Sequence, residues 1–213
     1  MVGWEDHESA PMLVLEDLSA GKWPPPWDER RIELVLAQIR AMHGAKVSLE
    51  RYAQVHGSRR ANWQTVAERP ETFLRLGLAD ARWLENALPL LLREEARCSV
   101  DGDSLTHWDL RSDNMCFAGS RVVFVDWNNA CLSNPQLDIG FWLPSLAHEG
   151  GPKPERILPD APEVAARVSG FFAALAGLPP VRDAPKVRVV QRQQLVTALA
   201  WVVRALELPP PGN

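Results

Sequence analysis

"LTHWDLRSDN", residues 105–114, is a polar stretch that lies between segments of mainly apolar sequence. Two β-like runs follow, "NMCF" (114–117) and "RVVFVDW" (121–127), and the short "AGS" between them is typical of a hairpin turn. Asp109 is therefore predicted to lie in a loop, and Asn114 at the start of the first strand. This order indicates a small β-hairpin with a polar loop in front of it.

Helical patterns surround the hairpin on both sides. Residues 29–43 carry apolar side chains at helical spacing, with Asp28 as the expected N-cap and Gly44 at the expected end. Residues 47–98 are also predicted to be helical, with a kink or a break at Pro89. Further helices are predicted over residues 135–147, 162–176 and 185–207. The expected fold class is α+β and mainly helical, with the small β-hairpin at its centre.

The predicted domain organisation is simple. Residues 1–11 are expected to form a loose N-terminal segment, 12–207 one domain, and 208–213 a proline-rich tail. The apolar run "MLVLE" (12–16) is interpreted as a buried strand. The proline-rich stretch 17–27 that follows it is expected to be a stiff, extended loop.

Composition restricts the classes of partner. The net charge is −4 and the isoelectric point is near 5.8, so no overall positive field favours nucleic acid or an anionic membrane. No apolar run approaches the roughly 20 residues that a membrane span needs. Cys98, Cys116 and Cys131 are odd in number and show no metal-binding spacing, so reduced thiols and a cytoplasmic location are expected.

Three side chains around the hairpin suggest a common chemistry. Asn114 begins the first strand and Asp126 ends the second, so antiparallel pairing would bring both to the same end of the hairpin. Their oxygens could share a hard cation such as Mg²⁺. Asp109, a few residues upstream, could accept a proton from a substrate hydroxyl. This is the set of groups that phosphoryl transfer requires.

The same residues carry a resemblance to a known family. "HWDLRSDN" followed by "VVFVDW" resembles the catalytic and metal-binding segments of aminoglycoside phosphotransferases and of the related choline and homoserine kinases, which share a protein-kinase-like fold. "PMLVLEDLS" is similar to the hinge strand of that family, and "NPQLDIGFWLPSL" to the helix after the metal loop. The resemblance implies that residues 12–207 form the hinge and the C-terminal lobe.

The resemblance also implies roles for single residues. Asp109 would be the catalytic base or the residue that orients the substrate hydroxyl, and Asn114 and Asp126 would be the Mg²⁺ ligands. The backbone around Glu16 and Leu18 would contact the adenine of ATP. The implied activity is an ATP-dependent transfer of the γ-phosphate to a hydroxyl of a small molecule, with ATP and Mg²⁺ as cofactors.

Two further residues would support the loop. The resemblance implies that His107 is a structural residue that holds the loop, and that Asp138 is the buried aspartate that braces it.

The sequence departs from the family pattern at its start. Only eleven residues precede the hinge-like strand, no glycine-rich loop is found among them, and the first lysine, Lys22, comes after the hinge. The chain could be a fragment of a longer protein, a protein with the C-terminal lobe alone, or a chain whose site a partner completes. Because the phosphate cover and its lysine are missing, feeble kinase activity at best is expected of these 213 residues.

Other interpretations remain open at this point. The chain could be a non-catalytic nucleotide- or ligand-binding domain, or, with less support, a metal-dependent hydrolase. Asn114 and Asp126 could cap the hairpin end without a metal, and Asp109 could be a turn aspartate. The resemblance implies that the acceptor pocket is built by helices of residues 47–98 and 150–205. A polycationic acceptor would need clustered carboxylates, for which the candidates are Glu94, Glu95, Asp101, Asp103, Glu149, Glu155, Asp160 and Glu163.

Overall fold

The computed structural model describes residues 2–7, 9–57 and 62–212. Its helices are α1 (Glu29–His43), α2 (Tyr52–His56), α3 (Asn62–Glu68), α4 (Pro70–Leu74), α5 (Ala81–Arg97), α6 (Pro135–His148), α7 (Pro162–Leu175) and α8 (Val187–Ala205), with 3-10 turns η1 (Ser112–Asn114) and η2 (Pro154–Arg156). Its strands are β1 (Gly3–Glu5), β2 (Met12–Val14), β3 (Ser104–Thr106), β4 (Met115–Ala118), β5 (Arg121–Phe124) and β6 (Cys131–Ser133). The predicted class, α+β and mainly helical, is confirmed.

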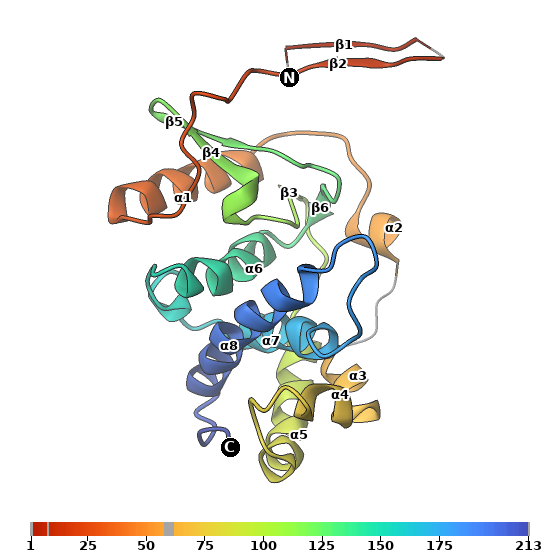
Figure 1. The fold of residues 1–213 in the computed structure, drawn as a ribbon, viewed down its shortest axis with the longest axis vertical. Helices are drawn as coiled ribbons and strands as arrows, with labels where there is room; N and C mark the ends of the chain where they lie inside the picture. Colours follow the sequence, from red (N-terminus) through yellow and green to blue (C-terminus); the bar gives the residue numbers. More distant parts are fainter. Residues whose placement is uncertain (1, 8, 58–61, 213) are drawn as a thin grey trace.

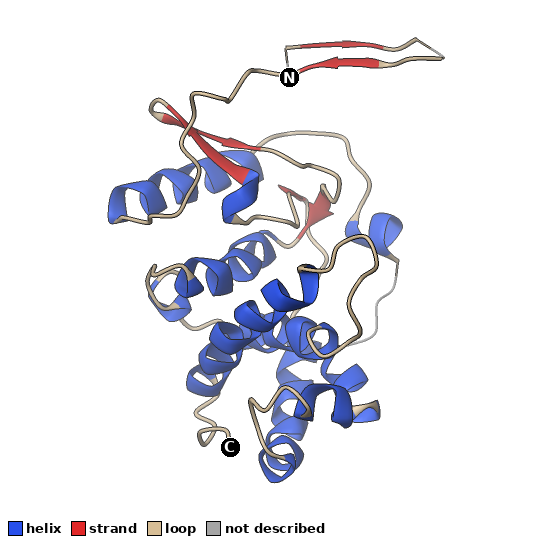
Figure 2. Ribbon diagram, viewed as in Figure 1, coloured by secondary structure: helices blue, strands red, loops and turns tan. Residues whose placement is uncertain are grey.

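The strands gather in one half of the molecule together with α1, and helices fill the other half (Figures 1 and 2). Helix α7 packs against α3, α5 and α8, and α8 also packs against α6. The largest fully buried side chains include Trp63, Trp142 and Trp201, which lie in α3, α6 and α8. Burial of such large apolar surfaces stabilises the packing of these helices.

Helix α1 has the predicted ends. The Asp28 side chain accepts a hydrogen bond from the Arg31 amide at 2.8 Å, which caps the first turn, and Gly44 follows the last helical residue. Val35, Ile39 and Met42 form its buried stripe. The stripe turns this helix towards β3 and β5, which brings its C-terminal His43 close to the loop after β3.

The central hairpin is formed as predicted. β4 and β5 pair antiparallel, with Met115 opposite Phe124 and Ala118 opposite Arg121. Gly119 in the two-residue turn has a φ of 64°, a left-handed conformation that glycine adopts without strain. A second antiparallel pair, β3 with β6, sets Ser104 opposite Ser133. The polar loop therefore leaves one strand of this pair, and α6 follows the other.

Two expectations about local structure were wrong. The segment before residue 12 is not all loose, because β1 pairs with β2 in an antiparallel hairpin (Figure 1). β2 itself is exposed along its whole length, whereas the run 12–16 was expected to be buried. Nothing within the described chain covers this apolar hairpin, so its residues pair with each other only.

Helix α5 runs through Pro89 without a break. Proline removes one hydrogen bond to the carbonyl of Glu85, four residues earlier. Pro89 and Glu85 both lie on the exposed face of the helix, where water can satisfy that carbonyl. The buried face, with Leu84, Ala87 and Leu91, keeps the helix continuous.

No helix in the described part of the chain is both long and apolar enough to cross a membrane.

Gly102 is predicted to be required where β3 begins. A Cβ atom at this position would lie 2.4 Å from the Ser133 carbonyl oxygen and 2.8 Å from the Asn134 amide nitrogen, so the backbone before α6 would have to move. We expect Gly102→Ala to lower the free energy of unfolding by about 1–3 kcal/mol, measured by urea denaturation. In the control Gly44→Ala, the new atom meets nothing closer than 3.5 Å. An equal effect of both substitutions would contradict the prediction.

Candidate active site

The loop between β3 and η1 is held by the carboxylate of Asp138, in the first turn of α6. Asp138 is 1% exposed. It accepts hydrogen bonds from the His107 amide at 2.9 and 3.1 Å and from the Trp108 amide at 2.8 Å. Hydrogen bonds from N–H groups to a buried carboxylate are among the stronger ones in proteins. The loop therefore takes its position from α6.

A third partner of Asp138 comes from α1. The His43 ring nitrogen Nε2 lies 3.1 Å from the Asp138 carboxylate. His43 and Asp138 are 95 positions apart in the chain, so no local pattern in the sequence pairs them. Sequence analysis missed this contact, which joins α1, the loop and α6 at one point.

Trp108 has an uncommon backbone conformation at the turn of the loop. Its φ is 64°, in the left-handed region that is unfavourable for a residue with a bulky side chain. Two contacts hold it there: its amide donates to Asp138, and its indole Nε1 donates to the Ser133 hydroxyl at 2.8 Å. The next residue, Asp109, is half-buried and lines a cavity.

His107 ties the loop to the end of the hairpin. The side chain is fully buried; its Nε2 lies 2.9 Å from the Val125 carbonyl oxygen and its Nδ1 lies 3.3 Å from the Asp109 amide nitrogen. These partners assign a neutral ring that donates from Nε2 and accepts at Nδ1. Burial lowers the pKa of His107, with the Asp138 carboxylate acting in the opposite direction. His107 thus has the surroundings of a structural residue.

Asp109 and Asn114 are joined directly. The Asn114 side-chain amide donates to the Asp109 carbonyl oxygen at 2.8 Å and to its carboxylate at 3.1 Å. The other carboxylate oxygen lies 3.2 Å from Arg111 Nε. Burial raises the pKa of the Asp109 carboxyl, against the opposing effect of the Arg111 charge. The carboxylate is therefore fixed in direction and more basic than an ordinary aspartate.

Asn114 and Asp126 lie at the same end of the hairpin, as the antiparallel pairing predicts. The Val125 amide donates to the Asn114 carbonyl oxygen at 3.1 Å, and Asp126 is the next residue. Asp126 has a φ of 64°, and its carboxylate accepts a hydrogen bond from the side-chain amide of Asn128 at 2.5 Å. Like Trp108, it is a non-glycine residue in a strained conformation beside the loop.

The donor set at this end fits a hard cation. The nitrogen of the Asn114 amide is taken by Asp109, so its oxygen is the atom left for a ligand. The exposed Asp126 adds a carboxylate. Mg²⁺ favours oxygen ligands and keeps several positions for water and phosphate oxygens, so two protein ligands suffice.

The segment expected to contact adenine lies along the hairpin. Glu16 forms an ion pair with Arg121 at 2.6 Å. The Lys22 backbone exchanges two hydrogen bonds with that of Phe117, at 2.9 and 3.0 Å. The Leu18 carbonyl oxygen accepts from the Gly21 amide at 2.9 Å. Adenine contacts of Glu16 and Leu18 remain a prediction.

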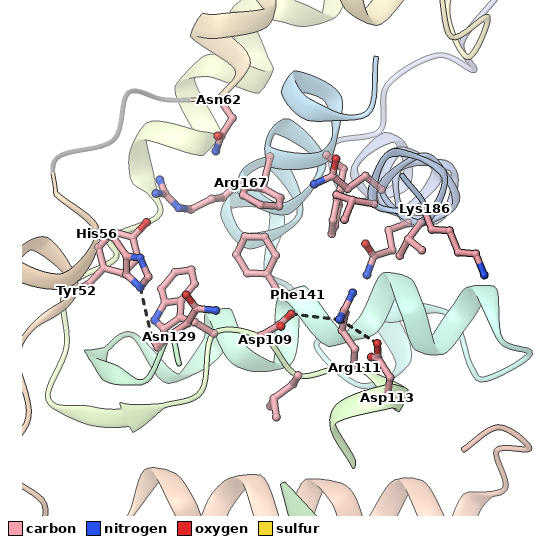
Figure 3. A pocket seen from close by; sticks show the side chains of 18 residues that line it. Tyr52, His56, Asn62, Asp109, Arg111, Asp113, Asn129, Phe141, Arg167 and Lys186 are labelled. Atoms are coloured by element: carbon pink, nitrogen blue, oxygen red, sulfur yellow. Dashed lines mark hydrogen bonds and ion pairs between the residues drawn. The ribbon is translucent and has the colours of Figure 1, made fainter. Parts of the chain in front are cut away.

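A cavity of about 510 Å³ opens beside Asp109 (Figure 3). It lies between the loop on one side and α7 and α8 on the other. Asp109, Arg111 and Asp113 are on the loop side. The aromatic lining side chains are Tyr52, Trp108, Phe141, Phe171 and Phe172, the remaining cations are Arg167 and Lys186, and His56 also lines the cavity. The cavity thus has an apolar body and charged groups at its edges.

The acidic residues considered for a polycationic acceptor lie elsewhere. None of the eight candidates lines the cavity beside Asp109. Glu149 lines a second cavity of about 620 Å³, on the side of the proline loop. There it accepts hydrogen bonds from Trp27 Nε1, at 2.7 Å, and from the Ser112 hydroxyl, and so links that loop to η1. Glu149 thus connects two segments of the structure by hydrogen bonds.

Comparison with known proteins identifies the family. A family model described as the phosphotransferase enzyme family (APH) matches residues 5–182. The match includes the braced loop, the hairpin and α6, and the chain therefore belongs to this family. The resemblance to aminoglycoside phosphotransferases that the sequence suggested is confirmed.

Solved structures of an aminoglycoside phosphotransferase and of a glucosamine kinase are similar to this chain. One is a thermostable mutant of aminoglycoside phosphotransferase APH(4)-Ia in a ternary complex with AMP-PNP and hygromycin B. It shows 14% identity and a TM-score of 0.48, over 83% of this chain and 64% of that one. Glucosamine kinase shows 16% identity and a TM-score of 0.37, over 96% of this chain and 58% of that one. The chain thus spans less than two thirds of the length of either protein. A search of curated proteins found no match.

Removal of the Asp138 carboxylate is predicted to loosen the whole loop. In Asp138→Ala, the amides of His107 and Trp108 would lose their acceptor in a buried place, so we expect a loss of about 2–6 kcal/mol in the free energy of unfolding, from about 1–3 kcal/mol for each unsatisfied donor. Asp138→Asn keeps one acceptor oxygen and should lose about 1–3 kcal/mol.

The measurement is urea denaturation, with Asp101→Ala as the control because Asp101 is exposed and lies away from the loop. An Asp138→Ala protein as stable as this control would show that the loop does not depend on the brace.

Proposed function

We propose that this protein transfers the γ-phosphoryl group of ATP to a hydroxyl of a small molecule. The observation that carries the proposal is the direct contact of Asp109 with Asn114, at the hairpin end where Asp126 also lies. Family membership supports the general class of phosphotransferase. The site residues add the specific roles below.

Asp109 receives the acceptor hydroxyl in this proposal. It faces the cavity, and its carboxylate is held in one direction by Asn114 and Arg111. The hydroxyl oxygen forms the new bond to the γ-phosphorus, the bond from that phosphorus to the oxygen retained by ADP breaks, and the hydroxyl proton passes to Asp109. The pKa of Asp109, raised by burial, favours this last step.

Asn114 and Asp126 would hold Mg²⁺ by their side-chain oxygens. Bound there, the ion would neutralise charge on the phosphates of ATP. Asn114 has a second role, since its amide nitrogen orients Asp109. The backbone near Glu16 and Leu18 would contact adenine, along the edge of the same hairpin.

The partner is a small hydroxyl-bearing molecule. A cytoplasmic location remains part of the proposal, and the three buried cysteines, which are free thiols, agree with a reducing compartment. The residues proposed to hold Mg²⁺ and to contact adenine all lie within the described chain. Binding of nucleotide is therefore the first test.

Binding of Mg²⁺ and ATP is predicted to depend on Asp126. At ligand concentrations 10 to 100 times the Kd, the two ligands together should raise the free energy of unfolding by about 1–3 kcal/mol. Asp126→Ala should abolish this increase, because the exposed carboxylate would be lost without loss of packing. The measurement is thermal and urea denaturation with Mg²⁺ alone, ATP alone and both.

Asp101→Ala is the control, since it removes an equal charge from another exposed position. Stabilisation that survives in Asp126→Ala would overturn the assigned metal site. No stabilisation of the parent protein would favour a domain that binds another ligand and does not use ATP.

Asp109→Asn is predicted to separate transfer from binding. Any phosphoryl transfer should fall by about 10²–10⁴-fold, because an amide cannot take the proton. Mg²⁺ and ATP binding should persist. Since burial raises the pKa of Asp109 and so disfavours its charge in the fold, the variant should be at least as stable as the parent near neutral pH. Transfer and denaturation are both measured, and undiminished transfer would remove Asp109 from the mechanism.

A further inference from the structure

The cavity beside Asp109 has a continuous aromatic wall. The ring centres of Tyr52 and Trp108 are 4.5 Å apart, those of Trp108 and Phe141 5.6 Å, and those of Phe141 and Phe171 5.2 Å. Such a wall favours a flat or apolar ligand body. It does not by itself determine the charge of the ligand, because aromatic faces also attract ammonium cations.

The cavity lining carries more positive than negative charge. Its two carboxylates, Asp109 and Asp113, are both within reach of Arg111, at 3.2 and 3.0 Å. Arg167 and Lys186 add two more positive charges to the lining. The lining thus has three cationic side chains, counting Arg111, against two carboxylates that share one guanidinium, a formal excess of one positive charge.

Arg167 is the cation best placed to meet a ligand. It lies in α7 and is half-buried. Figure 3 shows it across Phe141 from Asp109, on the opposite side of the cavity. Within residues 2–7, 9–57 and 62–212, no hydrogen bond or ion pair of its guanidinium is found.

Glu95 is the anion that acts on Arg167, and its oxygens accept three hydrogen bonds from the start of α3. The carboxylate is 1% exposed and accepts from the Asn62 amide at 2.8 Å, the Asn62 side chain at 2.9 Å and the Trp63 amide at 2.8 Å. Burial raises the pKa of Glu95, and the Arg167 charge acts to lower it. Glu95 is therefore a fixed cap of α3, and the donors of Arg167 remain available to the cavity.

We propose that the acceptor is an aromatic hydroxy acid, with its carboxylate on Arg167 and its hydroxyl directed to Asp109. A guanidinium offers a planar pair of donors that matches a carboxylate. Lys186 adds attraction at the rim. The ammonium group of an amine in the same place would be repelled by the positive charges of Arg167 and Lys186. The role of the hydroxyl rests on the proposed phosphotransfer, whereas the charge preference does not.

The test is calorimetric titration of the 213-residue chain, without nucleotide, with three molecules of the same ring and different charge. These are p-hydroxyphenylacetate, its neutral alcohol analogue tyrosol, and the amine tyramine. We expect the acid to bind at least about tenfold more tightly than tyramine, with tyrosol between them.

Arg167→Gln should bring the affinity for the acid down to that for tyrosol, and Arg167→Lys should retain part of the preference. Lys186 lies at an exposed rim position, so Lys186→Gln should also reduce the affinity for the acid, with less effect on the structure. Arg82→Gln is the matched control, because Arg82 is exposed on α5 and outside the cavity.

Three results would overturn the proposal: no measurable binding of the acid, tyramine binding as tight as the acid, or acid affinity unchanged in Arg167→Gln. Because nucleotide is absent from this titration, failure of the phosphotransfer proposal is seen separately, in the Mg²⁺ and ATP experiment. A preference for the acid with no ATP binding would retain the cavity assignment and reject the kinase one.

Discussion

The position of the loop between β3 and η1 depends on one buried carboxylate. Asp138 accepts from the amides of His107 and Trp108 and contacts the ring of His43. A buried carboxylate is tolerated only when its partners stay in place, because a lost partner leaves charge without compensation. α1, the loop and α6 are therefore positioned together or not at all. This explains how a polar loop keeps a fixed geometry between helices that pack by apolar contacts.

Strain lies at the two edges of the site. Trp108 and Asp126 both have a φ of 64°, and each is next to a residue that holds the loop or the hairpin end. Non-glycine residues in this region are destabilised by about 1–2 kcal/mol, so the surrounding hydrogen bonds must compensate for the strain. At Trp108 the compensation comes from Asp138 and Ser133. The two strained residues thus lie next to or within the set formed by Asp109, Asn114 and Asp126.

The features predicted correctly from the sequence were those with local causes. The cap of α1 at Asp28, the hairpin turn at Gly119 and the common end of Asn114 and Asp126 follow from short-range patterns. His43 contacts Asp138 because the fold brings α1 and α6 together, and nothing near His43 in the sequence indicates this contact. The error at β2 has the same origin, since exposure of a strand is decided by packing elsewhere.

Asp109 stands between two unlike halves of the site. On the proposed acceptor side, α7, α8 and the loop line a cavity with aromatic walls and more cations than carboxylates. On the proposed nucleotide side, Asn114 and Asp126 lie at a hairpin end, and Asp126 is open to solvent. In this proposal, selectivity for the acceptor comes from side chains of the described fold, because the aromatic groups that would contact its body pack against one another. Tight binding of phosphates needs further groups that exclude water around them, since exposed charges are strongly screened. In this proposal, the acceptor half can bind its ligand tightly even where the phosphate half is open to water and binds phosphates weakly.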